Sequence, residues 1–117
     1  MIQKLLIANR GEIACRIART ASGMGIKTLA IASAVDRQAM HVLACDDVVQ
    51  LGGNSPLESY LCGVDIIDAG QTHNVDAIHP GYGFLSEDPD FAQAVLDAGL
   101  IWVGPSPSAI RSMGLKD

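Results

Sequence analysis

One stretch, residues 77–87 (AIHPGYGFLSE), contains the side chains with the clearest potential for chemistry. It begins as an apolar strand that should end at His79, because the proline that follows lacks the backbone N–H that a sheet ladder needs. Gly81 and Gly83 then flank Tyr82, and glycines this close together let a ligand or another segment approach the main chain. A strand end, a glycine-rich loop and a helix start are where open α/β sheets bind ligands. The loop is therefore predicted to be one wall of a binding site.

The sequence predicts a structural role for His79 in that site and not a catalytic one. A histidine beside proline at a strand end is more often hydrogen-bonded to the backbone than catalytic. The chain also contains no G-x-S-x-G nucleophile elbow, no H-E-x-x-H metal motif and no Walker A loop. These hydrolase, metalloprotease and P-loop classes are therefore not predicted.

The first strand-to-helix turn argues against dinucleotide binding. It reads ANRGEI at residues 8–13, with one glycine where the G-x-G-x-x-G fingerprint needs three. A pyrophosphate would meet the side chains of Arg10 and Glu12 instead of bare backbone. Asp36 falls near the expected place of a ribose-binding acid, but it lies in a polar turn and is not diagnostic. NAD binding is accordingly disfavoured.

Hydrophobic patterning predicts the elements that must position the glycine-rich loop. Apolar strands are expected at residues 4–8, 27–32, 47–51, 76–78 and 100–103, with helices between them. Continuous apolar runs are typical of strands covered on both faces, and alternating strands and helices indicate parallel pairing. The predicted fold class is α/β, a five-stranded parallel doubly wound, Rossmann-like sheet with helices on both faces. Residues 1–117 are expected to form one domain.

In the helix after the first strand, the small side chains of Ala14 and Ala18 are expected to allow close packing. The helix also carries one apolar stripe. Its members recur at helical spacing: Ile13, Ile17, Ala21 and Met24. Arg16 and Arg19 lie on a different face of this helix, and Glu12 is one turn before Arg16.

Composition and charge narrow the function classes. The chain is 49% hydrophobic, and its 13 acidic and 8 basic residues give a formal charge of −5. An acidic surface argues against nucleic acid or an anionic membrane as the main partner, and no apolar run is long enough to span a bilayer. Cys15, Cys45 and Cys62 are far apart, so neither a disulfide framework nor a CxxC metal site is predicted. We expect a soluble protein of a reducing compartment.

Three blocks of sequence, taken in order, carry a specific resemblance. They are IANRGEIA at 7–14, HPGYGFLSE at 79–87, and Gly104-Pro105 together with MGLK at 113–116. Their order and spacing resemble the N-terminal domain of biotin carboxylase, the ATP-dependent component of biotin-dependent carboxylases. The resemblance covers nearly the whole chain and implies the first, pre-ATP-grasp lobe of an ATP-grasp enzyme.

The resemblance implies roles for five residues. Lys116 falls on a lysine that contacts ATP, and Tyr82 and Gly83 fall on the loop that borders the biotin pocket. Arg16 and Arg19 fall on a helix that helps to form a homodimer. From the residues alone, a solvated terminal lysine, a packed loop tyrosine and an ordinary solvated helix face remain alternatives. No catalytic residue and no metal ligand is assigned, because the family's metal-binding glutamates and bicarbonate-binding arginine lie in later portions.

The implied reaction uses MgATP (or Mn²⁺) and bicarbonate to carboxylate biotin that is carried on another domain. The implied cofactors are therefore ATP, Mg²⁺ or Mn²⁺, and biotin, none held tightly by this chain alone. The implied partners are the remaining biotin carboxylase lobes, the biotin carboxyl carrier domain and a carboxyltransferase subunit. Alone, residues 1–117 are expected to be inactive, and Asp117 is not expected to be the natural end of such a protein.

The sequence most resembles the biotin-carboxylase-bearing α subunits of acyl-CoA carboxylases of the methylcrotonoyl-CoA or propionyl-CoA type. Acetyl-CoA carboxylase and pyruvate carboxylase are alternatives, and a non-catalytic nucleotide-binding or interaction domain is the alternative of another class. The expected location is the cytoplasm, or the mitochondrial matrix in a eukaryote.

Overall fold

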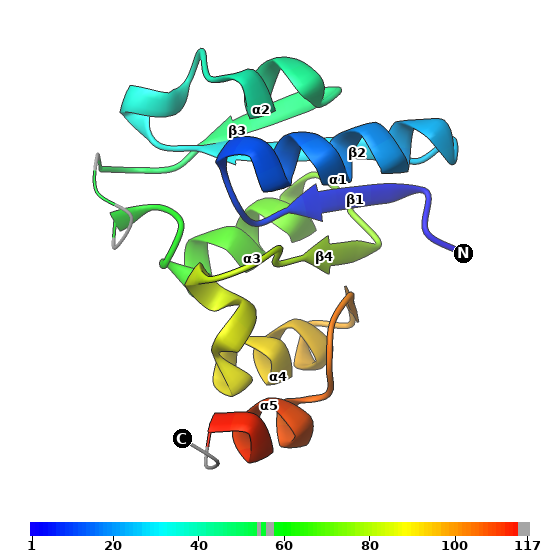
Figure 1. Ribbon diagram of the computed structural model, residues 1–117, viewed down its shortest axis with the longest axis vertical. Helices are drawn as coiled ribbons and strands as arrows, with labels where there is room; N and C mark the ends of the chain where they lie inside the picture. Colours follow the sequence, from blue (N-terminus) through cyan, green and yellow to red (C-terminus); the bar gives the residue numbers. More distant parts are fainter. Residues whose placement is uncertain (54, 56–57, 115–117) are drawn as a thin grey trace.

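A parallel sheet forms the centre of the computed structural model, which describes residues 1–53, 55 and 58–114. Within these residues, five strands pair in the order β3-β2-β1-β4-β5, all parallel (Figure 1). They are β1 (Lys4–Ile7), β2 (Lys27–Ala32), β3 (Asp47–Gln50), β4 (Ala77–His79) and β5 (Ile101–Trp102). The chain moves outward from β1 to β3 and then returns to β4. The strand order therefore reverses between β1 and β4, the kind of switch point where open α/β sheets bind ligands.

Helices cover both faces of the central strands, as the sequence predicts. The described helices are α1 (Gly11–Gly23), α2 (Met40–Ala44), α3 (Gly63–Thr72), α4 (Pro89–Asp97) and α5 (Pro107–Gly114), with 3-10 turns η1 (Ala34–Asp36) and η3 (Phe84–Glu87). Side chains of β1 alternate between two cores: Leu6 packs in the cluster that includes α3 and α4, and Leu5 packs in the cluster of α1. The doubly wound α/β architecture is thus confirmed.

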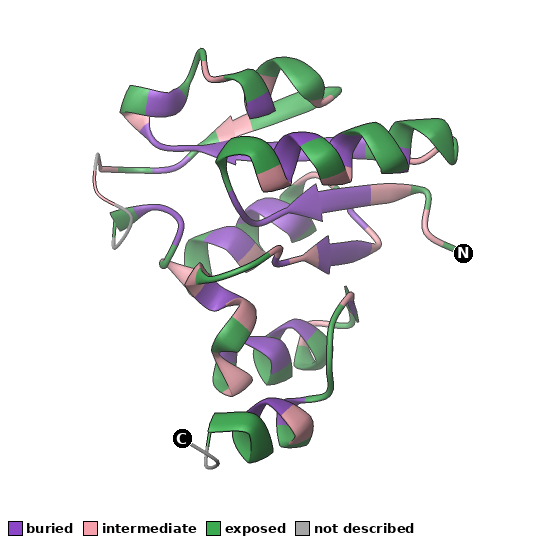
Figure 2. Cartoon of the chain, viewed as in Figure 1, coloured by how far each residue is buried: buried purple, intermediate pink, exposed green. Residues whose placement is uncertain are grey.

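Burial is complete at the centre of the sheet and partial at its edges. Figure 2 shows β1 and β2 almost wholly buried. In the outer strands, Val48 of β3 and Ile101 of β5 are exposed. The apolar runs predict that the two outer strands are buried on both faces, but these strands are partly exposed. A sequence pattern does not reveal how far the helices extend across a sheet.

The face of α1 that packs on the sheet is made by Ala14 and Ala18, whose close packing the sequence predicts, and by Ala21 of the predicted stripe. Ala14 and Ala18 are fully buried, whereas Ile13 and Ile17 are only partly buried and Met24 is 70% exposed. Small side chains let the helix lie close to the strands, so the alanines make the contact. The larger side chains lie beside that contact and line a groove.

Candidate functional site

The predicted loop lies at the switch point, where β1 and β4 end side by side. The amide of Ala8 donates to the carbonyl of His79 (2.9 Å), which extends the β1–β4 pairing to the last residue of β4. After it, the loop contains three positive φ angles: 67° at Gly81, 64° at Gly83 and 47° at Phe84. Left-handed conformations suit glycine and are costly for other residues, so both glycines are required by the backbone and Phe84 is held there by its surroundings.

Tyr82 and Gly83 form the accessible part of this loop. The Tyr82 side chain is 76% exposed, and a Cβ added at Gly83 would meet no atom within 4 Å. The loop therefore presents an aromatic ring and an adjacent stretch of open main chain. Such a surface can pack against a flat, partly polar ring system, which an aromatic side chain contacts through its face.

Asn9 attaches the loop to the end of β1. Its side-chain amide donates to the carbonyl oxygens of Pro80 (2.8 Å) and Tyr82 (2.6 Å). Its Oδ1 accepts from the amide of Arg10 (2.8 Å). Asn9 is 2% exposed, so these contacts are made away from solvent. Sequence analysis did not single out this residue.

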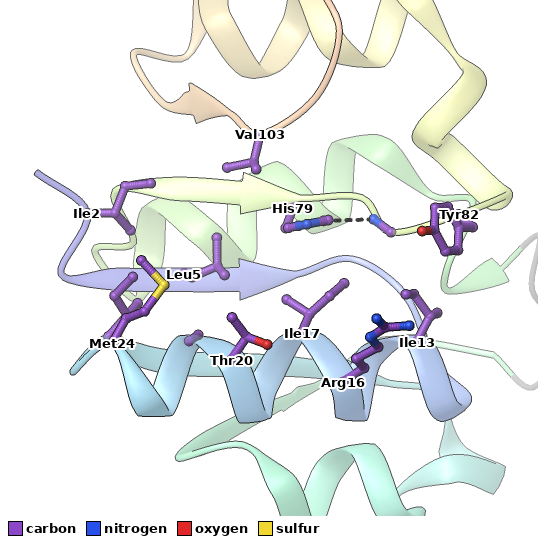
Figure 3. Close-up of a pocket in the computed structure, with 13 residues that line it drawn as sticks. Ile2, Leu5, Ile13, Arg16, Ile17, Thr20, Met24, His79, Tyr82 and Val103 are labelled. Carbon is purple, nitrogen blue, oxygen red and sulfur yellow. Dashed lines mark hydrogen bonds between the residues drawn. The ribbon is translucent and has the colours of Figure 1, made fainter.

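His79 has the backbone-bonded role that the sequence favours. Its Nδ1 accepts a hydrogen bond from the amide of Gly81 (3.1 Å), drawn as a dashed line in Figure 3. An Nδ1 that accepts is unprotonated, which corresponds to the neutral ring with its proton on Nε2. Burial lowers the pKa of His79 below its ordinary value, in keeping with this neutral state. His79 therefore helps to shape the turn after β4.

A groove of about 400 Å³ runs from Tyr82 along α1 (Figure 3). Most of its lining is apolar; the lining residues used below are Leu5, Ile13, Arg16, Ile17, Met24, His79, Tyr82 and Val103. Strand β4 and the end of β5 form one wall, and the outward side chains of α1 form the other. A concave, mostly apolar groove of this volume is of the kind that proteins use for binding.

A second group of polar side chains fills the space at the ends of β1 and β2. The guanidinium of Arg10 donates to both oxygens of Asp36 (2.7 and 2.9 Å), and the Tyr60 hydroxyl donates to Asp36 Oδ2 (2.6 Å). The Tyr60 hydroxyl in turn accepts from the amide of Ser33 (3.3 Å). Arg10 also lies over the Tyr60 ring, with Cζ 5.9 Å from the ring centroid. Sequence analysis did not predict this cluster.

The electrostatics of this cluster favour a permanently ionised Asp36. Hydrogen bonds from Arg10 hold the pKa of the Asp36 carboxyl well below its usual range, and they raise the pKa of Arg10. Burial raises the pKa of the Tyr60 hydroxyl, and its bond to Asp36 raises that pKa further. Asp36 is thus bound by its own protein at the place where a dinucleotide-binding fold needs a free acid for a ribose. Asp36 is therefore not free to bind a ribose, which is a second reason not to expect NAD binding.

The structure brings three of the five predicted site residues together. Tyr82 and Arg16 both line the groove, and Gly83 follows Tyr82 in the loop (Figure 3). Arg19 is exposed on α1, outside the groove lining. Lys116 lies outside the described residues.

Residues 1–53, 55 and 58–114 lack two further kinds of feature. No group of three or more His, Cys, Asp or Glu side chains in this part of the chain is arranged to hold a metal ion. None of the helices described there has the length and apolarity to cross a membrane.

The family described as "Biotin carboxylase, N-terminal domain" matches residues 1–110. Among curated proteins, the α subunit of mitochondrial methylcrotonoyl-CoA carboxylase from Arabidopsis thaliana is 55% identical over 115 residues. That match covers 98% of this chain and 16% of the relative. A biotin carboxylase from Allochromatium vinosum is 52% identical over 116 residues, which is 99% of this chain and 26% of the relative.

Solved structures agree with the sequence matches. The biotin carboxylase domain of a thermophilic 2-oxoglutarate carboxylase, solved with bicarbonate, superposes with a TM-score of 0.93 at 41% identity. The superposition covers 97% of this chain and 26% of that one. This chain therefore spans about a quarter or less of the length of the relatives named here.

Proposed function

This chain belongs to the biotin carboxylase N-terminal domain family, and from that premise we propose that it is the first lobe of an ATP-dependent biotin carboxylase. In the proposed protein, the remaining lobes continue after residue 117 and complete the active site. MgATP, or MnATP, activates bicarbonate there for transfer to biotin. Residues 1–117 alone are then an inactive part of the enzyme.

The accessible Tyr82–Gly83 segment is the observation that carries this proposal. It combines an exposed aromatic ring with open main chain at the switch point of the sheet. The main chain is held by the bonds from Asn9 to the carbonyls of Pro80 and Tyr82 on one side and by the packing of Phe84 on Tyr60 on the other. The proposed role of Tyr82 and Gly83 is to form one wall of the biotin pocket. The Tyr82 ring would contact the face of the bicyclic ureido group, and the absence of a side chain at Gly83 would let it approach.

The proposal places the other cofactor contacts at or beyond the end of the described residues. Lys116 is proposed to contact ATP, for which its ammonium group is a suitable point charge. Metal ligands are assigned to the later lobes.

The groove along α1 is proposed to be covered by one of those later lobes. Ile17, Met24 and Val103, which are partly or largely exposed here, would then be removed from water, which offsets the cost of ordering the two lobes. Arg16 and Arg19 are proposed to contribute to a homodimer contact on the same helix. Other proposed partners are a biotin carboxyl carrier domain and a carboxyltransferase subunit.

The acyl substrate is proposed to be an acyl-CoA of the methylcrotonoyl or propionyl type. Support comes from the 55% identity with the methylcrotonoyl-CoA carboxylase α subunit. A keto acid is the alternative substrate, since a human pyruvate carboxylase is 50% identical. The proposed location is the cytoplasm, or the mitochondrial matrix in a eukaryote.

The first measurement is the coding sequence downstream of Asp117. The proposal requires several hundred further codons that include a glycine-rich ATP-grasp loop and paired metal-binding glutamates. A reading frame that stops close to Asp117 would remove it.

The second measurement is ATP hydrolysis by the longer protein, which should require both bicarbonate and free biotin. Tyr82→Ala should lower kcat/KM for biotin by about 5–150-fold, which corresponds to about 1–3 kcal/mol, whereas Tyr82→Phe should keep most of it because the ring remains. Equal activity in the Tyr82→Ala variant would remove Tyr82 from the site. Residues 1–117 alone should hydrolyse no ATP.

A further inference from the structure

We propose that Asn9 is a positioning residue of the site, one that fixes the main chain of residues 80–83 through its side-chain amide. The inference rests on the proposed function for the consequence in catalysis, but the anchoring itself is independent of it. Asn9 is not proposed to contact the substrate itself. It acts through its hydrogen bonds to the carbonyl oxygens of Pro80 and Tyr82.

The hydrogen bonds assign the orientation of the Asn9 amide without ambiguity. The two groups near Nδ2 are carbonyl oxygens, which only accept, and the group near Oδ1 is the backbone N–H of Arg10, which only donates. Both N–H groups of the side chain are used. No other neutral residue of this size has two donors on one atom, so the pair of carbonyls specifies asparagine at this place.

Gly81 makes the contact possible. A Cβ at Gly81 would lie 2.6 Å from Asn9 Nδ2 and 3.0 Å from Asn9 Cγ, closer than atoms pack. The amide therefore lies directly beneath the Gly81 main chain, between the two carbonyls that it bonds. The glycine at residue 81 is explained by Asn9 as well as by its φ of 67°.

A second contact holds the other side of the Tyr82–Gly83 segment. The ring of Phe84 packs on the ring of Tyr60 with centroids 5.6 Å apart, and Phe84 keeps a φ of 47° there. The amide of Ser86 then donates to the carbonyl of Gly83 (2.9 Å). The exposed residues are thus held from both sides, so a ligand that contacts them loses little loop entropy on binding.

The two contacts that hold the loop, Asn9 on one side and Tyr60 on the other, are connected through Arg10 and Asp36. The Arg10 amide that orients Asn9 belongs to the residue whose guanidinium binds Asp36, and Asp36 binds Tyr60. Asn9 is nevertheless the direct contact to the loop, so its removal should release the main chain while Tyr60 and Asp36 keep their bonds.

The anchoring is tested by amide hydrogen exchange on residues 1–117 with Asn9→Asp. This change keeps the shape of the side chain but places a carboxylate oxygen against two carbonyl oxygens. Exchange of the Gly81 and Ser86 amides should become about tenfold faster or more. The Ile101 amide, bonded to the carbonyl of Asp76 at the other end of β4, should be unchanged.

The matched control is Asn74→Asp, the same chemical change at an exposed asparagine before β4. It should leave the Gly81 and Ser86 amides unaffected. If Asn9→Asp does not fold, Asn9→Ser, with a single donor, takes its place with the same readouts. Unchanged exchange of Gly81 and Ser86 in a folded Asn9 variant would overturn the proposal.

The consequence in catalysis is tested in the longer enzyme. Asn9→Asp should raise the KM for free biotin about tenfold and leave the KM for ATP unchanged, because the displaced segment borders only the biotin pocket. Equal changes in both constants, or none, would overturn the positioning role. If the wild-type enzyme carboxylates no biotin, the proposed function fails, and the exchange measurement still decides whether Asn9 anchors the loop.

Discussion

The hydroxyl of Tyr60 offers a direct test of the polar cluster at the ends of β1 and β2. Tyr60→Phe removes one oxygen atom and leaves the buried ring, which is 1% exposed and packs on Phe84. The lost bond is a 2.6 Å hydrogen bond to an ionised carboxylate, of a kind that contributes about 1.5–3 kcal/mol. The Ser33 amide also loses its acceptor, at a cost of about 1 kcal/mol.

The expected loss in free energy of unfolding is therefore about 2.5–4 kcal/mol. Asp36 keeps both bonds from Arg10, so the loss should stay below that for breaking the whole cluster. Urea unfolding of residues 1–117, followed by circular dichroism, measures it. At an m-value of about 1–3 kcal/mol/M, the midpoint should fall by about 1 M or more.

The matched control is Tyr82→Phe, which removes the same atom from an exposed tyrosine. Its free energy of unfolding should change by less than about 0.5 kcal/mol. If Tyr60→Phe costs no more than Tyr82→Phe, the cluster does not stabilise the fold and the account of Asp36 given above is wrong.

Three further predictions concern charge, backbone and assembly. Because the pKa of folded Asp36 is below its unfolded value of about 3.9, its stabilisation is complete above that pH and is lost as the pH falls. Asp36→Asn should therefore lower stability at pH 7 and flatten its dependence on pH below about 5, measured by urea unfolding; an unchanged slope would contradict this. Gly81→Ala should cost about 1–3 kcal/mol in the same assay, because a side chain is strained at its φ and meets Asn9, whereas Gly83→Ala should show the strain alone. In the longer protein, Arg16→Glu with Arg19→Glu should shift sedimentation from dimer toward monomer, and an unchanged dimer would remove both arginines from the contact.

The strands were predictable because each is a short apolar run between polar turns. β1 and β2 begin at the predicted residues. After the first lysine of each strand, burial on both faces favours apolar side chains, with the buried Thr28 as the exception.

The close packing expected of Ala14 and Ala18 is confirmed, and Ala21 of the predicted stripe is buried. Ile13, Ile17 and Met24 were grouped in the same stripe but are not buried, because helical spacing records apolarity and not size. Ala14 and Ala18 pack on the sheet, and Ile17 and Met24 lie over the groove beside it.

The loop was predictable and its anchors were not. Pro80, Gly81 and Gly83 predict the turn after β4 from the sequence alone. Asn9, Arg10 and Asp36 are ordinary turn residues when seen locally. Asn9 meets Tyr82, and Arg10 meets Asp36, only after parallel pairing brings separate strand ends to one edge of the sheet. No short-range sequence pattern predicts contacts between residues so far apart in the chain.

The central place of β1 has a consequence for how the chain folds. β1 precedes the other strands of the sheet in the chain, yet Leu5 pairs with Thr28 on one side and with Ala77 on the other. Pairing across such a separation is slow, because a long loop must close before the contacts form. Until residue 77 is available, β1 presents an unpaired edge that favours association between chains. Nascent or truncated chains that end before β4 should therefore depend on chaperones. The central part of the sheet should form only after β4 has left the ribosome and can pair with β1.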